Sequence, residues 1–274
     1  MHHVRYSIVF PCHNEAPHIE RLLRKAELAF APLDHEIIVV ADGCSDGTER
    51  VVRAFARHAP SVRLVTSSQR LGKGGAIRKG IAESRGEFVG FMDSDGEIDP
   101  SFMLVGFRRL AAGATDIVIG NRYGQGGSYR TTLSRHLTSR VYQAAIWILF
   151  GLQFHDTQAG MKAFTATAAK KLFAASNIDG YAFDIDVLMH AHWMGYRIEE
   201  VPMQQRFKGT STISFKHVLE MVADTCGTYD RHARELRATG VAWYRIPTML
   251  RSYAFYPFTS ALEFALRAVI HKGR

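Results

Sequence analysis

The stretch Phe88-Val89-Gly90-Phe91-Met92, followed directly by Asp93-Ser94-Asp95, decides the fold class of this chain. A short apolar run bounded by polar residues predicts a buried strand. Two carboxylates then stand at its carboxyl end, where open α/β sheets bind their ligands. Hard oxygen donors on one turn suit Mg²⁺ or Mn²⁺ bound to a diphosphate. An isolated pair of this kind is also typical of an Asp-rich turn, so the rest of the chain decides between the two interpretations.

Apolar runs alternate with helical patterns through the first two-thirds of the chain. We expect strands at 6–10, 36–40, 62–66, 88–92 and 116–119, with helices near 19–28, 49–58 and 73–84. This alternation predicts right-handed βαβ units and a mostly parallel α/β sheet flanked by helices. After residue 119 we expect a glycine-rich mobile loop over 123–129, a long helix over 133–149 and a last strand within 198–205.

Length and composition are those of a folded globular protein. The chain has 274 residues, of which 47% are hydrophobic and 22% charged. We expect one α/β domain over 1–215 and a helical extension over 216–274. Three cysteines far apart favour a reducing compartment. We find no signal peptide and no apolar stretch of the roughly 20 residues that a spanning helix needs, so we expect a cytoplasmic protein.

The net charge of +8 and the isoelectric point near 9.5 favour a polyanionic partner. Nucleic acid is not expected, because no zinc, helix-turn-helix or aromatic-basic signature is present. Near the C-terminus, Leu266, Val269 and Ile270 share one helical face, with Arg267 and Lys272 close by. Such a helix can lie at the cytoplasmic membrane surface as a peripheral anchor. The alternative is that it docks on the protein's own core.

Polar clusters also follow the first two expected strands, at 11–15 and at 41–48. Parallel strands place their carboxyl ends together, so Asp42 is expected in the same row of acids as Asp93 and Asp95. Residues 45–48 are interpreted as a turn and helix cap. Lys73 lies among glycines that open a helix, an arrangement that can bind a phosphate. The spacing of a P-loop is absent.

A series of ordered motifs now points to one family. The motifs P-x-x-N-E at 11–15, A-D-G-C-S-D-G-T at 41–48, G-K-G-G-A-I-R-K-G at 72–80 and D-S-D-G at 93–96 resemble those of the family 2 inverting glycosyltransferases with the GT-A fold. Further on, I-G-N-R-Y at 119–123, D-T-Q-A-G-M-K at 156–162 and F-D-I-D at 183–186 resemble the branch that uses polyprenyl and dolichyl phosphates. This branch includes dolichyl-phosphate β-glucosyltransferases and mannose synthases.

The resemblance implies a role for each matching residue. For the nucleotide sugar it implies Pro11, His13, Glu15, Asp42, Lys73, Ser94, Gln158 and Lys162, the last two at the sugar or on the loop beneath it. For metal and diphosphate it implies Asp93 and Asp95, with Glu97 as a possible further metal ligand. For phosphates of donor or acceptor it implies Arg122, Arg130, Arg135, Arg206 and Lys208. Asp93, Asp95, Arg122, Asp184 and Asp186 are the candidates for catalysis.

The implied reaction is transfer of a hexose, with inversion, from UDP-glucose or GDP-mannose to a polyprenyl or dolichyl phosphate. A divalent metal, Mg²⁺ or Mn²⁺, neutralises the leaving diphosphate. A phosphate acceptor is already ionised and needs positioning by Arg or Lys rather than a protein base. A saccharide hydroxyl would instead need a carboxylate base, for which Asp184 and Asp186 are candidates. Both could alternatively stabilise a helix N-terminus.

Two further classes stay open. A sugar nucleotidyltransferase shares the parallel sheet and a metal-binding acid, but it needs a glycine-rich, arginine-bearing loop after the first strand, which residues 11–15 do not provide. A non-catalytic module that binds sugar nucleotides or a lipid surface would tolerate loss of the acids, yet all are present. The histidines have no metal-ligand spacing: His190 and His192 are too close for the i, i+4 pair.

Overall fold

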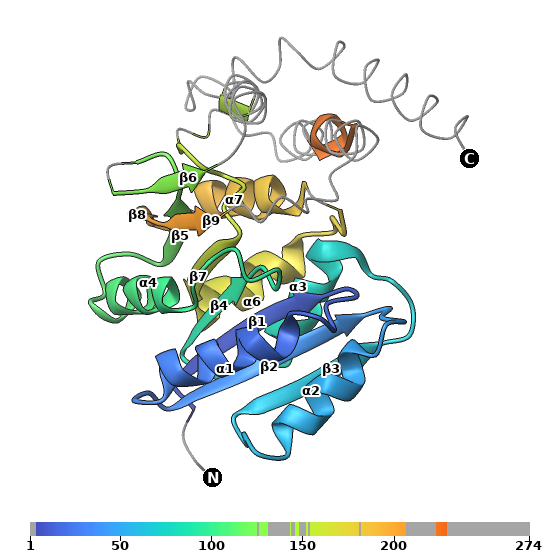
Figure 1. Ribbon diagram of the computed structural model, residues 1–274. Coiled ribbons are helices and arrows are strands. Elements are labelled where there is room, and N and C mark those ends of the chain that lie inside the picture. The colour runs from blue at the N-terminus through green and yellow to red at the C-terminus, as the bar shows by residue number, and fades with distance from the viewer. Residues whose placement is uncertain are drawn as a thin grey trace, which may run out of the picture.

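The strands of the computed structural model confirm a mostly parallel α/β sheet (Figure 1). The structure describes residues 4–124, 126–130, 143, 146, 147, 152, 154–180, 182–206 and 223–228, with only the backbone at 129 and 130. The main sheet has the strand order β3-β2-β1-β4-β7-β5-β8. Its strands are β1 (Tyr6–Cys12), β2 (His35–Asp42), β3 (Val62–Ser67), β4 (Phe88–Met92), β5 (Ile117–Asn121), β7 (Met161–Thr165) and β8 (Ile198–Pro202).

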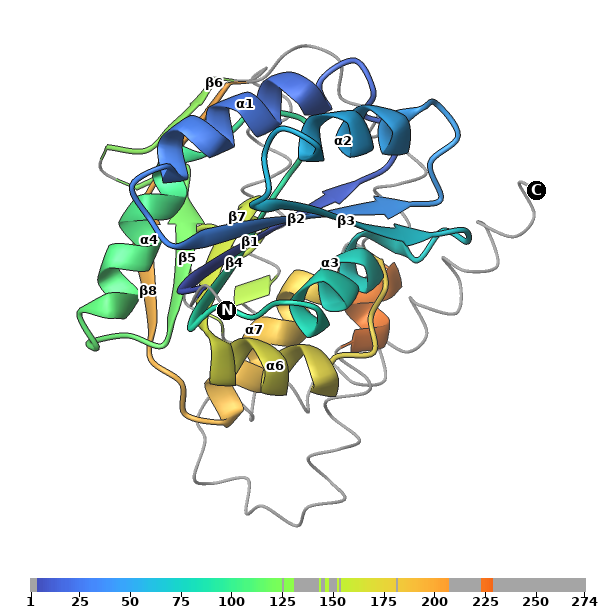
Figure 2. The ribbon, with the colours of Figure 1, turned by 90° about the horizontal axis from the view of Figure 1, so that it is seen from below.

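Helices cover both faces of this sheet (Figure 2). On one face lie α1 (Ile19–Phe30), α2 (Thr48–Ala56) and α4 (Ser101–Ala111). On the other lie α3 (Gly72–Ala82), α6 (Ala166–Ala175) and α7 (Phe183–Trp193). The central strands are therefore buried on both sides, and neighbouring residues such as Ile8 and Val9 point into opposite cores. This burial explains why the sequences of β1 and β2 are nearly continuous apolar runs.

One strand of the main sheet runs against the others. β7 pairs antiparallel with β4 and with β5, and Met161 lies opposite Met92. The amino end of β7 therefore lies at the same edge as the carboxyl ends of the parallel strands. The sequence does not predict this strand, because Lys162 interrupts its apolar run. The reversal brings residues 156–160 to the edge that holds Asp93 and Asp95.

The prediction of a loop over 123–129 is wrong for its last two residues. Ser128–Arg130 forms β6, which pairs in parallel with β9 (Gln204–Arg206) in a separate two-stranded sheet. The single predicted strand within 198–205 is divided between β8 and β9, separated by Met203. The predictions also lack α4 and α6, whereas the strand at 88–92 has the predicted bounds.

The two remaining sequence predictions concern the C-terminal part and the membrane. The predicted helix over 133–149 and nearly all of the extension over 216–274 lie outside the described residues. Of the helices that the structure describes, none has the length and apolarity required to span a membrane. The division at residue 215 and the amphipathic C-terminal helix stay predictions.

Candidate active site

Asp93 and Asp95 lie at the end of β4, on the edge of the sheet where the sequence places them. The backbone N–H of Asp93 donates to the carbonyl of Gly160 at 2.9 Å, so the segment before β7 supports the acidic turn. A Cβ at position 160 would collide with the Asp93 carboxylate, so a glycine here leaves that carboxylate in its place. Between the two acids, the Ser94 hydroxyl donates to the carbonyl of Pro11 at 2.7 Å. The D-S-D turn is thus hydrogen-bonded to β1 and to the segment just before β7.

Lys73, in the first turn of α3, forms an ion pair with Asp93. Its Nζ lies 2.6 Å from Oδ1 of Asp93. Burial lowers the pKa of Lys73, but the Asp93 and Asp184 carboxylates outweigh burial and raise it, so the side chain stays charged. The helix start is fixed because the N–H of Gly74 donates to the carbonyl of Asp179 at 2.9 Å. A Cβ on Gly74 would collide with the carbonyl of Ile178, which explains the glycines around this lysine.

The carboxyl of Asp95 has a pKa well above that of an ordinary aspartate. Burial and the charge of Asp93 raise its pKa to about 7, although the N–H of Glu97 donates to it at 2.9 Å. Two crowded carboxylates of this kind fit a divalent cation, which would relieve their repulsion. No cluster of three metal-ligating side chains occurs within the described part of the chain. The donor set therefore suits Mg²⁺ or Mn²⁺ completed by phosphate oxygens and water.

Glu97, the possible third metal ligand, is hydrogen-bonded to β9. Its Oε2 accepts a hydrogen bond from Nε2 of Gln205 at 2.8 Å, and its carbonyl accepts from the N–H of Arg206 at 3.0 Å. These bonds join the segment after the acidic turn to β9. The backbone of Arg206 thus lies near the acids, and its side chain is exposed.

Asp42 ends β2 and binds the loop that leads into α3. Its carboxylate accepts from the N–H groups of Leu71 at 2.5 Å and Gly72 at 3.0 Å. Its carbonyl oxygen lies 2.7 Å from Nδ1 of His13. The N–H of Glu15 donates to the hydroxyl of Thr48 at 2.8 Å. The loops after β1, β2 and β3 are therefore joined, as the resemblance leads one to expect of residues that share a ligand.

Lys162 and Asp184 form a second ion pair beneath the first. The Nζ of Lys162 lies 2.5 Å from Oδ1 of Asp184 and 3.0 Å from the carbonyl of Ala159. Lys162 has a relative exposure of 0% and Asp184 of 4%, so both members of this pair are enclosed by protein. The role of Lys162 at the sugar or beneath it stays a prediction. Burial lowers the pKa of Lys162 and raises that of Asp184, and their mutual attraction opposes both shifts. Asp186, one helical turn from His190, has 0% exposure.

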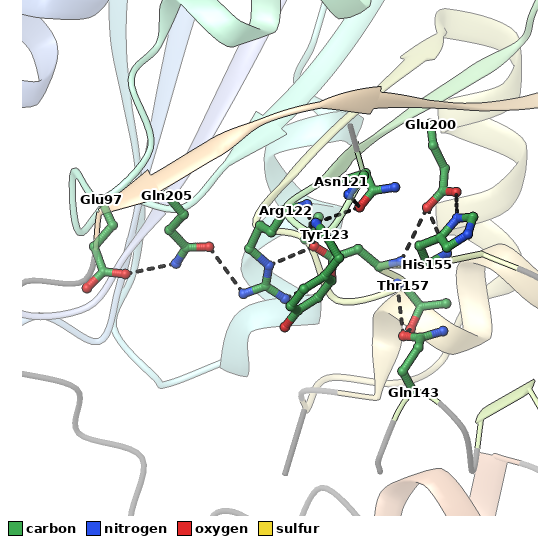
Figure 3. A network of polar contacts seen from close by, with 12 residues as sticks. Glu97, Asn121, Arg122, Tyr123, Gln143, His155, Thr157, Glu200 and Gln205 are labelled. Carbon is green, nitrogen blue, oxygen red and sulfur yellow. Dashed lines mark hydrogen bonds and ion pairs between the residues drawn. The ribbon is translucent and has the colours of Figure 1, made fainter. Parts of the chain in front are cut away.

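Arg122, directly after β5, belongs to a chain of polar contacts (Figure 3). Its Nε and NH2 donate to the two oxygens of Asp156 at 2.7 and 2.8 Å. Its NH1 donates to Oε1 of Gln205 at 3.2 Å, and Gln205 in turn binds Glu97. On the other side, Glu200 accepts from the N–H groups of His155 and Asp156. The chain thus connects the loop after β4, strand β9, the end of β5 and the segment before β7.

A comparison with protein families decides the identity. The model of glycosyl transferase family 2 matches residues 7–173, more than half of the chain. The chain belongs to glycosyl transferase family 2. The glycosyltransferase activity predicted from the ordered motifs is thereby confirmed at the level of the family, as is the fold.

Among curated relatives of this glycosyltransferase, the dolichyl-phosphate beta-glucosyltransferase of Drosophila melanogaster is 30% identical over 236 residues, covering 80% of this chain and 72% of that protein. The dolichyl-phosphate beta-glucosyltransferase ALG5A of Trichomonas vaginalis is 29% identical over 233 residues, covering 81% and 72%. Glycosyltransferase AglD of Haloferax volcanii is 28% identical over 77% of this chain. The match spans only 34% of that longer protein.

Solved structures support the same fold. Glucosyl-3-phosphoglycerate synthase from Mycobacterium tuberculosis, in complex with uridine-diphosphate, superimposes with a TM-score of 0.61 at 23% identity and covers 82% of this chain and 78% of that one. The same enzyme with Mg²⁺ and uridine-diphosphate gives a TM-score of 0.62 at 22% identity. At this identity the likeness establishes the GT-A-type architecture of the glycosyltransferase.

In this glycosyltransferase, the structure therefore brings together one part of the predicted site. His13, Asp42, Lys73, Asp93 and Asp95 gather at one edge through the contacts above. Gln158 lies half-buried in the turn before β7. The side chain of Arg130 and all of Arg135 and Lys208 lie outside the description.

Three residues that the sequence analysis gave no role complete the site. Gly160 admits Asp93, Asp156 binds Arg122, and Gln205 bridges Arg122 and Glu97. The glycine could have been noticed, because it belongs to the quoted motif D-T-Q-A-G-M-K at 156–162. No local signal marks Gln205, which is 83 residues from Arg122 in the chain.

Proposed function

We propose that this family 2 glycosyltransferase transfers a hexose, with inversion and with a divalent metal, from a nucleotide sugar to a polyprenyl or dolichyl phosphate. The observation that carries the donor half is the pair of crowded carboxylates at the end of β4 beside a charged lysine. Anionic and cationic groups side by side suit a metal-bound diphosphate. We take UDP-glucose and GDP-mannose as the candidate donors.

On the donor side, Asp93 and Asp95 would hold Mg²⁺ or Mn²⁺, which supplies positive charge to the leaving diphosphate when bound. The Lys73 ammonium adds a second positive charge 2.6 Å from Asp93. The joined loops carrying Pro11, His13 and Glu15 would face the nucleoside. Asp42 would support them, because it already fixes Leu71 and Gly72. Ser94 would act by holding the acidic turn on Pro11.

The proposal of a phosphate acceptor depends on the burial of the two carboxylates that could serve as a base for a hydroxyl acceptor. Asp184 and Asp186 have relative exposures of 4% and 0%, and Asp184 is engaged by Lys162. Buried acids in such positions are poor candidates for deprotonating an incoming sugar. A phosphate oxygen needs no base, which favours the lipid phosphate. The names of the Drosophila and Trichomonas relatives support the same acceptor.

Positioning of the acceptor phosphate would fall to arginines near the glycine-rich segment. Arg122 donates hydrogen bonds to both carboxylate oxygens of Asp156, so its guanidinium is held in one orientation. Arg206 lies on β9, which the Glu97 carbonyl joins to the acidic turn. Arg130, Arg135 and Lys208 stay sequence predictions for the same task.

Such an acceptor implies a membrane surface, and we propose a peripheral cytoplasmic location through the C-terminal part. Flotation with anionic liposomes compares the full chain with a shortened protein ending at Arg251. Only the full chain is expected to float. Failure of both to float would favour a C-terminal helix docked on the protein's own core.

The proposed reaction is tested by incubating the purified protein with Mn²⁺, UDP-glucose or GDP-mannose, and either a short polyprenyl phosphate or simple sugars. Transfer to the lipid phosphate is expected. Asp184→Asn and Asp186→Asn should stay within about tenfold of wild-type, whereas loss of an essential base costs about 10²- to 10⁴-fold. Transfer to sugars alone, abolished in one of these variants, would replace the proposal with a hydroxyl acceptor. Donor binding without transfer to either class would indicate a binding module.

A further inference from the structure

Two lysine–aspartate pairs lie one behind the other on the α7 side of the sheet edge. The outer pair, Lys73 with Asp93, is about one-quarter exposed, with side-chain exposures of 22% and 25%. The inner pair, Lys162 with Asp184, is buried, with side-chain exposures of 1% and 5%. The four charges alternate in sign, and they come from four separate elements of the fold: α3, the end of β4, β7 and α7.

The two pairs affect one another. After Asp93, Asp184 is the charge that raises the pKa of Lys73 most, and it ranks ahead of Asp95. In return, the charge of Lys73 lowers the pKa of Asp184. The Nζ of Lys73 also lies 5.9 Å from the ring centre of Phe183, the residue before Asp184. Lys73 therefore stands within electrostatic reach of two carboxylates but makes its ion pair with the outer one.

Burial makes this choice of partner sensitive to Lys162. A buried carboxylate that loses its counter-ion costs several kcal/mol. Without Lys162, Asp184 would need another cation, and Lys73 is the lysine already close to it. A lysine side chain is long and has rotatable bonds, so it can change partners at little cost.

We propose that Lys162 is a positioning residue: by neutralising Asp184, it keeps Lys73 on Asp93. In this role Lys162 acts through Asp184 and Lys73, because its side chain is buried. The Lys73 ammonium thereby stays at the edge where, on the proposed function, the diphosphate of the donor is held. The inference rests on that function only for the identity of the ligand, and the pairing of the charges can be tested without it.

A purely structural role for Lys162 makes a different prediction. The Nζ of Lys162 also donates to the carbonyl of Ala159, next to the Gly160 that supports Asp93. If this bond were the important one, removal of Lys162 would disturb the turn whether or not Asp184 is charged. Removing the charge of Asp184 in the same protein therefore separates the two roles.

The experiment compares Lys162→Met, Asp184→Asn and the double variant by crystal structure and by calorimetric titration of UDP and GDP with Mn²⁺. In Lys162→Met, Lys73 should move to Asp184 and nucleotide affinity should fall at least about tenfold, as for a lost charge-assisted hydrogen bond. In the double variant, Lys73 should return to Asp93 and affinity should recover to within about threefold, a difference of about 0.6 kcal/mol. Asp184→Asn alone should keep Lys73 on Asp93 and retain affinity.

Glu36→Gln serves as the matched control. Glu36 is a buried carboxylate at the opposite end of the sheet, bound by Ser7, Arg63 and Arg85. Its loss should lower thermal stability and leave nucleotide affinity unchanged, so a general loss of stability is not mistaken for the effect.

Two results would overturn the inference: Lys73 still on Asp93 in Lys162→Met with unchanged affinity, or a double variant as weak as Lys162→Met. If Lys162→Met does not fold, the inference would be overturned by a loss of nucleotide affinity in Asp184→Asn or in the double variant. If the wild-type protein binds neither UDP nor GDP, the proposed donor is wrong, and the position of Lys73 in the crystal structures still decides the pairing.

Discussion

Asp93 and Gly160 are fitted to each other: the N–H of Asp93 donates to the carbonyl of Gly160 at 2.9 Å, and the space where a Cβ of residue 160 would stand is filled by the Asp93 carboxylate. The two residues are neighbours because β7 runs antiparallel to β4. The acidic turn is thus shaped by a residue 67 positions later in the chain (160 minus 93).

Gly160→Ala should therefore displace the Asp93 carboxylate while the protein stays folded. We expect a fall in activity of about 10²-fold or more, since small displacements of reacting groups have effects of this size. Mn²⁺ affinity, measured by electron paramagnetic resonance, should fall with it. Gly106→Ala is the control, because the nearest atom to its added Cβ is at 3.3 Å and lies in the core under α4, away from the site. Equal activity in the two variants would contradict this account of the turn.

Activity should require a divalent metal held by Asp95. Asp95→Ala is expected to lower turnover by about 10³-fold or more, a loss typical of a group that stabilises charge in the transition state. Circular dichroism should be unchanged, because the side chain lies at the end of β4 rather than within its core. Full transfer by the wild-type protein in excess chelator would rule out the metal role.

Asp95 should also make the metal-free protein less stable as the pH rises. Its pKa is about 7 when folded, against 3.8 for an unperturbed aspartate. The folded state therefore binds this proton more tightly, and the stability that the protonated group contributes is lost as pH rises from about 4 to about 7. Above this range, Asp95→Asn should be more stable than wild-type by on the order of 2–4 kcal/mol.

Thermal melts in chelator at pH 5 and pH 8 measure this difference between the two proteins. The gain of Asp95→Asn should be large at pH 8 and clearly smaller at pH 5. Adding Mn²⁺ at pH 8 should reduce the difference in stability between the two proteins, because the metal binds and stabilises only the wild-type carboxylate. A gain of the same size at both values of pH would show that the ionisation of Asp95 is not its cause.

Arg122 should matter through its bidentate geometry as well as its charge. Arg122→Lys keeps the charge but cannot bind both oxygens of Asp156, so we expect a higher KM for the lipid phosphate or a lower kcat. Arg122→Ala should lower kcat/KM further, by about 10²-fold in all, consistent with loss of a charged hydrogen-bonding group. Steady-state kinetics with donor and acceptor varied separately distinguish a higher KM for the lipid phosphate from a lower kcat.

Arg197→Ala is the control for this pair. Arg197 binds both oxygens of Asp116 with Nε and NH2 at 2.9 Å, as Arg122 binds Asp156, but it does so on the exposed surface next to β8. Its removal should leave both KM values unchanged. If Arg122→Ala behaved in the same way, the network around Asp156 would have no part in catalysis.

The sequence by itself determined the local elements and the acids at their ends. Strands β1 to β5 and helices α1 to α3 could be predicted because their apolar residues repeat with the period of a buried strand or an amphipathic helix. The position of Asp93 and Asp95 followed from the run Phe88–Met92, whose bounds the structure reproduces. Parallel strands share one carboxyl edge, so the grouping of Asp42 with these acids needed no tertiary information beyond fold class.

The tertiary structure alone decided which charge pairs with which. The reversal of β7 places Gly160 beside Asp93 and buries Lys162 against Asp184, and neither contact has a signal in the local pattern. The sequence also contained no indication that Lys162 would be enclosed by protein. Such pairings depend on the register between strands distant in sequence and on the burial that follows from it, because a charge removed from water must find its partner wherever the packing brings one.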